Sequence, residues 1–258
     1  MSIDPRAAVS PDAELAPDVE VGPFAVIGPR VVIGPRTRIG PHAVIRGPTV
    51  IGADNRIFQF ASIGDDPQDM KYRGEDTRLV IGDRNTFREY VTVNRGTVTG
   101  IGETRIGNDN LILAYSHVAH DCVLGDHVIM SNAVNLAGHV EVGDWAIFSG
   151  YAGAHQFCRI GAHAFIANNT AVLQDIPPFV LAAGQPAAPR AVNVEGLKRR
   201  GFSEEETRAI RNAFRVLYRN EMPLAAAAAQ IRQMAEEQPV LRLFADFLGQ
   251  ESRRGLAR

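Results

Sequence analysis

Aliphatic residues recur every six positions along most of this chain. The main runs are Ile3, Val9, Leu15, Val21, Ile27, Ile33, Ile39, Ile45, Ile51, Ile57, Ile63, then Ile81, Phe87, Val93, then Ile106, Ile112, Val118, Leu124, Met130, Leu136, Val142, Phe148, Ala154, Ile160, Ile166, Val172. A period of six fits neither an α-helix nor a simple alternating strand over long spans. It is typical of a parallel β-helix built from short strands.

The other positions of each hexad support this prediction. A small or β-branched residue usually stands two positions before the aliphatic, as Ala25 does before Ile27, and alternation points both inward. Glycine often follows the aliphatic, as in Gly28 and Gly34, and we expect it at corners where φ is positive. Three hexads would form a triangular coil of about eighteen residues, and coils would stack about 4.8 Å apart.

The repeat has two interruptions and an end. Polar stretches break it near residues 65–80 and 94–105, and loops of that length are usually functional or mobile. No hexads follow Val172. We therefore predict a β-helix domain over residues 1–186 with two loop insertions, and a small helical domain over 187–258.

Helix signals occupy that last region. Ser203 and Glu206 form the pattern of a capping box, which opens a helix. Pro223 and Pro239 are placed to begin a second and a third helix. These signals predict a helical C-terminal domain.

Composition excludes some classes of protein. With 258 residues, 45% of them hydrophobic, and a net charge of −2, the chain has no general attraction to nucleic acid. No apolar run approaches the roughly 18 residues of a transmembrane segment, and the start does not read as a signal peptide. We expect a cytoplasmic protein. Cys122 and Cys158 fall on small inward positions, which predicts buried free thiols.

Four of the seven histidines fall on three neighbouring coils: His117, His120, His139 and His155. An eighteen-residue coil puts His120, Gly138 and Gln156 in one column, and Asp121, His139 and Phe157 in the next. A histidine beside a carboxylate is a competent general base near neutral pH. The Gly138 amide, one coil away, would face a developing oxyanion. Solvated turn residues, or a zinc site made by three histidines, remain open alternatives.

A basic segment, Leu197–Arg200, follows Asn193–Gly196. It is either a solvated helix face or a site of phosphate recognition, for which arginine is well suited.

Together these motifs resemble the UDP-N-acetylglucosamine O-acyltransferases. The resemblance rests on the hexads and on QFASIG (59–64), HVAHDC (117–122), AGHV (137–140), HQFCRIGAH (155–163) and NVEGLKRRGF (193–202). It covers essentially the whole chain, and the last motif narrows a broad superfamily to this family.

The resemblance implies a mainly β fold: a left-handed parallel β-helix, shaped as a triangular prism, followed by a small α-helical domain. It implies a homotrimer with active sites between subunits. The implied reaction moves an (R)-3-hydroxyacyl group from acyl carrier protein to the glucosamine 3-hydroxyl of UDP-N-acetylglucosamine, the first step of lipid A biosynthesis. It needs no cofactor, no metal and no covalent acyl-enzyme, because the thioester is already activated.

Roles carry over onto matching positions. His120 would be the general base, Asp121 would orient it or tune its basicity, and the Gly138 amide would form the oxyanion hole. The residues implied in substrate binding are Asp69, Lys71, His117, His139, His155, Gln156, Asn193, Glu195, Arg199 and Arg200. Among these, Asp69 and Lys71 would contact the sugar and the acyl 3-hydroxyl region, Asn193, Glu195 and Arg199 would hold the uridine and phosphates, and Arg200 would meet the acidic carrier protein.

Two positions depart from the family pattern. Asn168 occupies the position that measures acyl length, where long-chain members often carry glycine, so we expect a preference for chains shorter than fourteen carbons. Pro186 stands where some members have histidine, which puts one acyl contact in doubt.

Three other functions remain as alternatives. They are a sister hexapeptide acyltransferase of the same pathway, a zinc-dependent enzyme like γ-class carbonic anhydrase, and a β-helix scaffold without catalysis.

Overall fold

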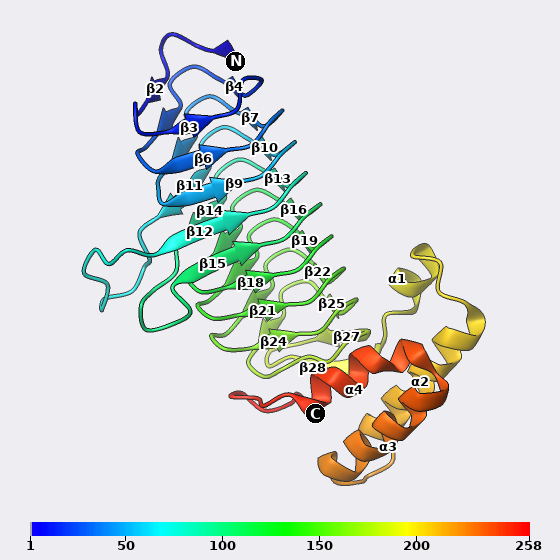
Figure 1. Cartoon of the computed structure of the whole chain (residues 1–258). Coiled ribbons are helices and arrows are strands. Elements are labelled where there is room, and N and C mark those ends of the chain that lie inside the picture. Colours follow the sequence, from blue (N-terminus) through cyan, green and yellow to red (C-terminus); the bar gives the residue numbers. More distant parts are fainter. Residues whose placement is uncertain (1) are drawn as a thin grey trace.

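The computed structural model describes residues 2–258, which form a triangular prism of three sheets with helices at one end (Figure 1). All strand pairs are parallel except the last pair of the first sheet. The first sheet contains β1 (Ser2–Ile3), β4 (Glu20–Val21), β7 (Arg38–Ile39), β10 (Arg56–Ile57), β13 (Thr86–Phe87), β16 (Leu111–Ile112), β19 (Ile129–Met130), β22 (Ile147–Phe148), β25 (Phe165–Ile166), β27 (Val180–Ala183) and β28 (Ala188–Val192). The second contains β2 (Ala8–Val9), β5 (Val26–Ile27), β8 (Val44–Ile45), β11 (Ser62–Asp65), β14 (Thr92–Asn94), β17 (His117–Val118), β20 (Asn135–Leu136), β23 (Gly153–Ala154) and β26 (Ala171–Val172). The third contains β3 (Glu14–Leu15), β6 (Val31–Ile33), β9 (Thr49–Ile51), β12 (Arg78–Ile81), β15 (Glu103–Ile106), β18 (Val123–Leu124), β21 (Glu141–Val142) and β24 (Arg159–Ile160).

The sequence period sets the register of the prism. Ile39 pairs with Val21 on one side and with Ile57 on the other, so equivalent hexad positions stack directly. The aliphatic positions are buried, with Ile27 1% and Ile45 0% exposed, and so is the small partner Ala25 at 0%. Each such isoleucine contributes about 1.5–3 kcal/mol by leaving water. The predicted inward face is therefore confirmed.

The expected role of the hexad glycines holds at Gly64, where φ is 78°, but is wrong for the others. Neither Gly28 nor Gly34 has a positive φ, and the left-handed residues stand two positions later, at Arg30 (φ 58°) and Arg36 (φ 57°). Glycine is needed for space instead, because a Cβ at Gly34 would lie 2.7 Å from the carbonyl carbon of Gly52 in the next coil. The close stacking of coils, rather than the turn, selects glycine.

A helical segment caps the last coil: α1 (Val194–Arg199), α2 (Glu204–Tyr218), α3 (Leu224–Glu237), the 3₁₀ turn η1 (Pro239–Leu241) and α4 (Arg242–Gly249). The capping box is confirmed, since the Ser203 hydroxyl accepts from the Glu206 amide and the Glu206 carboxylate accepts from the Ser203 amide. The antiparallel pairing of β27 with β28 was not predicted, because its Ala-, Gly- and Pro-rich sequence carries no strand pattern. The domain boundary at residue 187 stays a prediction.

Both cysteines are buried free thiols, as predicted. Burial raises the pKa of Cys122 to about 12 and that of Cys158 to about 11. Both thiols are thus protonated near neutral pH and are poor nucleophiles. Among the helices of residues 2–258, none is long and apolar enough to cross a membrane.

Candidate active site

The corner between the second and third sheets carries both insertions and the histidine cluster. We call it the histidine corner; it consists of the connections 66–77, 95–102, 119–122, 137–140 and 155–158. The two long connections project from the edge of the prism at the start of β12 and β15 (Figure 1). Stacking of coils therefore brings segments far apart in the sequence to one edge.

His120 and Asp121 form a hydrogen-bonded pair at this corner. His120 Nδ1 lies 2.8 Å from Asp121 Oδ2, and the two side chains are 14% and 0% exposed. With Asp121 ionised, Nδ1–H is the donor and Nε2 carries a free lone pair. This is the arrangement that a general base requires.

The second insertion, 95–102, encloses the Asp121 carboxylate. Its oxygens accept from the Thr97 amide at 3.1 Å, the Thr97 hydroxyl at 2.6 Å and the Ile101 amide at 3.0 Å. Burial alone would raise the pKa of Asp121, but the hydrogen bonds from His120 and Thr97 outweigh it and hold that pKa below its usual value. Asp121 thus stays ionised although it is buried.

Gly138 lies directly against the His120 ring. A Cβ at this position would be 2.5 Å from His120 Cε1 and 2.7 Å from Nε2, so only glycine leaves room for the imidazole. The next amide, of His139, donates to the His120 carbonyl at 3.0 Å. Within residues 2–258, the Gly138 amide donates no hydrogen bond to the protein. A free donor and a free base nitrogen therefore adjoin each other.

His139 extends the cluster by one coil. Its ring meets His120 edge-on at 5.0 Å and stacks on Phe157 at 4.4 Å with an interplanar angle of 8°. Burial is the main reason that the pKa of His139 lies below its usual value. His155 and Gln156 are exposed on the same connection as Phe157.

The ligand atoms of His120, Asp121 and His139 lie within 4.8 Å of one another, which is compatible with a metal site. Both carboxylate oxygens of Asp121, however, already accept hydrogen bonds from Thr97 and Ile101. The donor set therefore fits a hydrogen-bonded base better than a zinc ion.

An apolar groove of about 500 Å³ leads from this cluster across the second sheet. His117, Ala137, Ala154 and Val172 are among the residues that line it. His117 Nδ1 lies 2.7 Å from the Thr92 hydroxyl, and burial lowers the pKa of His117.

Tyr151 and Gln185 line the same groove, and Gln185 donates to the Asn169 carbonyl at 2.8 Å. Asn168 is exposed, and its Oδ1 would lie 3.3 Å from a Cβ built at Gly150. Asn168 thus stands at the corner that joins the first and second sheets, across the second sheet from His120.

The first insertion places Asp69 and Lys71 at the histidine corner. The Asp69 carboxylate accepts from the Lys71 amide at 2.9 Å, and the Lys71 side chain is exposed. The buried Arg95 anchors the insertion by donating to the Gly64 carbonyl at 2.6 Å and the Tyr72 hydroxyl at 3.1 Å. The loop is therefore fixed at its base while its tip faces solvent.

The C-terminal motif lies elsewhere. Asn193 caps α1 by accepting from the Gly196 amide at 3.1 Å and donates to the His163 carbonyl at 3.0 Å. Arg200 lies over the Trp145 ring and donates to the Trp145 carbonyl at 2.8 Å.

Glu195 and Arg199 are exposed on α1. The structure thus assembles the motif at the corner between the third and first sheets. Within one chain, the motif residues Asn193, Glu195, Arg199 and Arg200 do not come together with His120.

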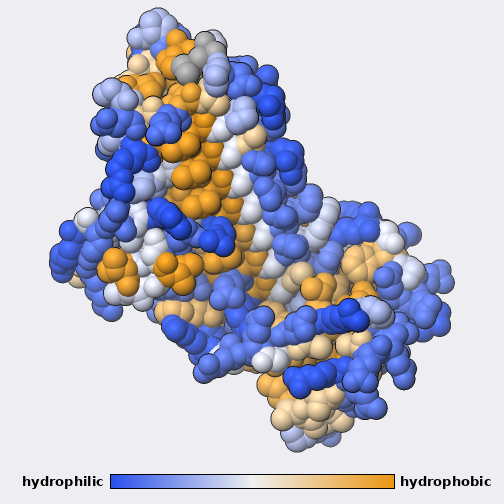
Figure 2. Space-filling view, viewed as in Figure 1, coloured by the Kyte–Doolittle hydropathy of each residue, from blue (hydrophilic) through white to orange (hydrophobic). Residues whose placement is uncertain are grey.

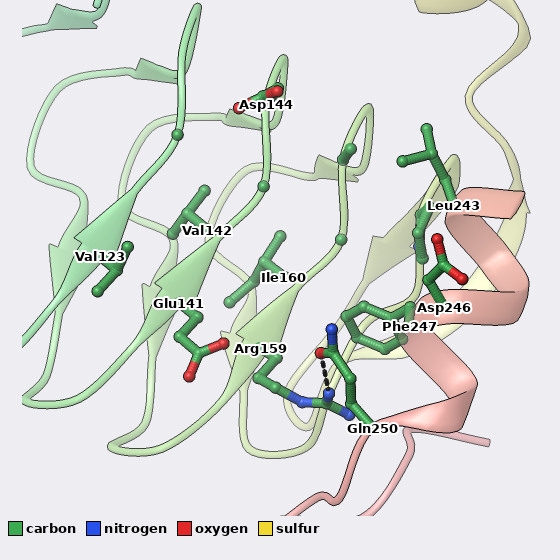
Figure 3. A pocket seen from close by; sticks show the side chains of 15 residues that line it. Val123, Glu141, Val142, Asp144, Arg159, Ile160, Leu243, Asp246, Phe247 and Gln250 are labelled. Atoms are coloured by element: carbon green, nitrogen blue, oxygen red, sulfur yellow. Dashed lines mark hydrogen bonds between the residues drawn. The ribbon is translucent and has the colours of Figure 1, made fainter. Parts of the chain in front are cut away.

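A separate cavity of about 380 Å³ lies between the third sheet and α4 (Figure 3). Arg159 in its wall donates to Gln250 at 2.8 Å and to Asp175 at 2.8 Å. The Arg159 guanidinium is thus held by groups of the chain itself, and the residues that line this cavity include none of the histidine cluster.

Sequence reasoning missed Thr97 and Ile101, which hold Asp121. The available signal was only the position of the insertion, one coil before His120.

A triangular β-helix of hexapeptide repeats with a hydrogen-bonded His–Asp pair beside a glycine amide is the architecture expected of the hexapeptide-repeat acyltransferases. The family of bacterial transferase hexapeptide repeats matches residues 12–47 and 103–134, and the family "Udp N-acetylglucosamine O-acyltransferase; Domain 2" matches residues 175–257. The chain belongs to the UDP-N-acetylglucosamine O-acyltransferase family.

Similar proteins that align with most of this chain support its assignment to this family. The acyl-[acyl-carrier-protein]–UDP-N-acetylglucosamine O-acyltransferase of Stutzerimonas stutzeri is 52% identical over 83% of this chain and 82% of the relative. The solved UDP-N-acetylglucosamine acyltransferase of Francisella novicida is 46% identical, with a TM-score of 0.97 over 99% of this chain and 94% of that one. The Moraxella catarrhalis enzyme is 40% identical, with a TM-score of 0.98 and full coverage of both chains. The predicted fold class, a left-handed parallel β-helix with a small helical C-terminal part, is confirmed.

Proposed function

We propose that this enzyme transfers an (R)-3-hydroxyacyl group from acyl carrier protein to the glucosamine 3-hydroxyl of UDP-N-acetylglucosamine, the first step of lipid A biosynthesis. The observation that carries the proposal is the His120–Asp121 pair beside the free Gly138 amide, in a chain 52% identical to a relative named for this reaction. We place the protein in the cytoplasm.

The catalytic cycle needs three groups. His120 Nε2 removes the proton of the sugar 3-hydroxyl as its oxygen attacks the thioester carbonyl, and Asp121 stabilises the imidazolium that forms. The tetrahedral oxyanion accepts from the Gly138 amide. Collapse breaks the C–S bond, and the thiolate of the carrier arm takes the proton from His120. The product ester and free thiol balance the reaction without a covalent acyl-enzyme or a metal.

The groove on the second sheet is suited to the acyl chain. Its apolar lining starts at His117 and extends toward Tyr151, while Asp69 and Lys71 reach the sugar and the acyl 3-hydroxyl. Asn168 would limit the chain, because a polar side chain there is costly to cover with methylene groups. We propose a preference for chains shorter than fourteen carbons.

The nucleotide site would be completed by a second copy of the chain in a homotrimer. His120 and the motif residues Asn193, Glu195, Arg199 and Arg200 lie at opposite edges of the third sheet, so one copy's motif can meet a neighbour's histidine corner. An apolar stripe follows this sheet (Figure 2), where Val32 and Val50 are 37% and 44% exposed. We place that face toward the threefold axis, His139, His155 and Gln156 against the sugar nucleotide, and Arg200 toward the acidic carrier protein.

The test mixes the purified chain with UDP-N-acetylglucosamine and 3-hydroxyacyl carrier proteins of several lengths, beside a His120→Ala variant. The expected result is O-acylated product from the wild type and a rate lower by about 10²–10⁴-fold in the variant. A clear optimum at fourteen carbons would contradict the role of Asn168.

Absence of product at every length would reject the proposed function. Stoichiometric zinc at His120, Asp121 and His139 together with carbonic anhydrase activity would then favour the metal-dependent alternative. Acylation of an amine instead of the hydroxyl would favour a sister acyltransferase.

A further inference from the structure

The C-terminal tail is fixed beneath the last coil. The buried Asp175 accepts from Arg159 Nε at 2.8 Å, its amide donates to the Gly255 carbonyl at 2.8 Å, and its carbonyl accepts from the Ala257 amide at 3.0 Å. On the other side of the tail, Gln250 accepts from Arg159 at 2.8 Å (Figure 3). The segment between Gln250 and Gly255 is therefore anchored at both ends.

This anchoring brings Arg253 to the histidine corner. Its guanidinium carbon lies 4.8 Å from the centre of the Phe157 ring. Phe157 stacks on His139 at 4.4 Å, and His139 meets His120 at 5.0 Å. Arg253 is thus connected to His120 through successive contacts with the rings of Phe157 and His139.

The charge of Arg253 is not neutralised by the chain itself. Among residues 2–258, no carboxylate forms an ion pair with it. Burial is the main cause of the low pKa of His139, and the positive charge of Arg253 acts in the same direction. The neighbouring Arg254 differs, because its Nε donates to the Leu173 carbonyl at 3.1 Å and serves the tail itself.

A guanidinium held over an aromatic ring is pre-organised to bind an anion. Its donors match a phosphate group in two-pronged geometry. Each substrate of the proposed reaction carries such a group: the pyrophosphate of the sugar nucleotide and the phosphodiester of the carrier's pantetheine arm. We propose that Arg253 is a substrate-binding residue that holds one of these phosphates, an assignment that rests on the proposed function.

The experiment measures kcat and KM for both substrates in the wild-type chain, Arg253→Gln and Arg253→Lys. Arg211→Gln is the matched control, since Arg211 is exposed on α2 and its loss changes net charge equally. We expect Arg253→Gln to raise one KM by about tenfold with kcat within twofold, Arg253→Lys to recover part of the loss, and Arg211→Gln to resemble wild type. Thermal unfolding of each variant checks that the tail still docks.

Two acyl donors distinguish the sources of phosphate: a 3-hydroxyacyl phosphopantetheine and the same thioester without its phosphate. A defect of Arg253→Gln seen only with the phosphorylated donor assigns Arg253 to the carrier arm. A raised KM for UDP-N-acetylglucosamine with either donor assigns it to the pyrophosphate. Unchanged KM values, or an equal change in Arg211→Gln, would overturn the proposal. Loss of product in the wild type itself would instead reject the proposed function, and the assignment with it.

Discussion

Two corners of the same prism use the same backbone but treat their polar groups in opposite ways. We call the connections 52–55, 82–85, 107–110 and 125–128 the ladder corner; they lie between the third and first sheets, on coils that precede those that hold the C-terminal motif. Asp109 there and Asp121 at the histidine corner share a left-handed conformation, with φ of 58° and 59°. What differs is where the side chains find partners.

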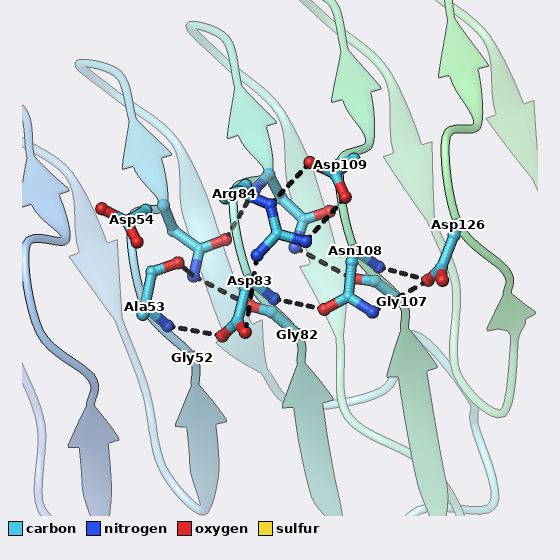
Figure 4. Close-up of polar contacts among 12 residues, drawn as sticks. Gly52, Ala53, Asp54, Gly82, Asp83, Arg84, Gly107, Asn108, Asp109 and Asp126 are labelled. Atoms are coloured by element: carbon cyan, nitrogen blue, oxygen red, sulfur yellow. Dashed lines mark hydrogen bonds and ion pairs between the residues drawn. The ribbon is translucent and has the colours of Figure 1, made fainter.

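At the ladder corner, each side chain satisfies the coil before it (Figure 4). Asp83 accepts from the Ala53 amide at 2.7 Å, Asn108 from the Asp83 amide at 2.8 Å, and Asp126 from the Asn108 amide at 2.6 Å. An inner ladder runs alongside it, made by the buried residues Asn55, Asn85 and Asn110. The donors and acceptors of this corner pair with one another, and these pairings stabilise the fold.

At the histidine corner, the Asp121 carboxylate accepts hydrogen bonds from Thr97, Ile101 and His120, and no ladder of side chains continues to the next coil. His120 Nε2 and the Gly138 amide keep their capacity for a ligand. Free polar groups on this repeat fold therefore arise where the ladder is interrupted: a glycine and two insertions replace the side chains that would cap the next coil.

The largest contrast is expected for glycine substitutions at the two corners. Gly138→Ala forces the His120 ring away, because the new Cβ would lie 2.5 Å from Cε1, and displacement of a catalytic group by about 1 Å costs about 10²-fold in kcat. At the ladder corner, the Cβ of Gly125→Ala would lie 2.1 Å from Asp144 Oδ1, so it should lower stability and leave kcat within about twofold. Steady-state kinetics and denaturant unfolding of both variants check this, and a wild-type kcat for Gly138→Ala would contradict it.

Asn85→Ala tests the inner ladder. Asn85 is 0% exposed. Its side-chain oxygen, Oδ1, accepts a hydrogen bond from the Asn110 backbone amide, and its side-chain NH₂ group donates to the Gly107 backbone carbonyl. Leaving these buried groups unpaired should lower the free energy of unfolding by about 2–3 kcal/mol, with kcat unchanged at 25 °C. Asn220→Ala, at an exposed site after α2, is the control and should stay within about 0.5 kcal/mol. If Asn85→Ala lowered kcat while remaining folded, the ladder corner would contribute to activity, and the proposed difference between the two corners would be wrong.

Much of this structure was predictable because a β-helix is nearly one-dimensional. Once the coil length is known, His120 and Gly138 must be neighbours, and the hexads fix which residues face inward. The inner Asn ladder and the space requirement at Gly34 were missed, because both depend on contacts between coils that a single hexad does not reveal.

The insertions and the tail lie outside the repeat, so their contacts could not be predicted from it. Thr97 meets Asp121 only through the folded shape of 95–102. Arg253 reaches Phe157 only because Asp175 anchors a segment far along the chain. Both contacts follow from tertiary packing and leave no periodic trace in the sequence.

Thr97→Val should have a smaller effect than Gly138→Ala. It removes the hydroxyl that donates to Asp121 Oδ2 at 2.6 Å while keeping the side-chain volume, and loosening Asp121 should lower kcat about tenfold with little change in KM. Thr97→Ser keeps the donor and should restore most of the rate. In an Asp121→Asn background, Thr97→Val should add little, since both changes act on one contact. Fully additive losses would show that Thr97 acts elsewhere.

The smallest effect is expected where the ladder corner faces water. Asp109→Asn breaks the pair with Arg84 at 2.8 Å, but the two side chains are 29% and 51% exposed, so the loss in unfolding free energy should stay below about 0.5 kcal/mol. Hydrogen bonding from Arg84 holds the pKa of Asp109 below its usual value. The contribution is therefore present above the ordinary pKa of an aspartate and is lost as the carboxylate protonates at lower pH. Denaturant unfolding of both proteins at neutral and acid pH measures it, and a cost above about 1 kcal/mol at neutral pH would mean that this corner depends on its outer ion pairs as well as on its buried ladder.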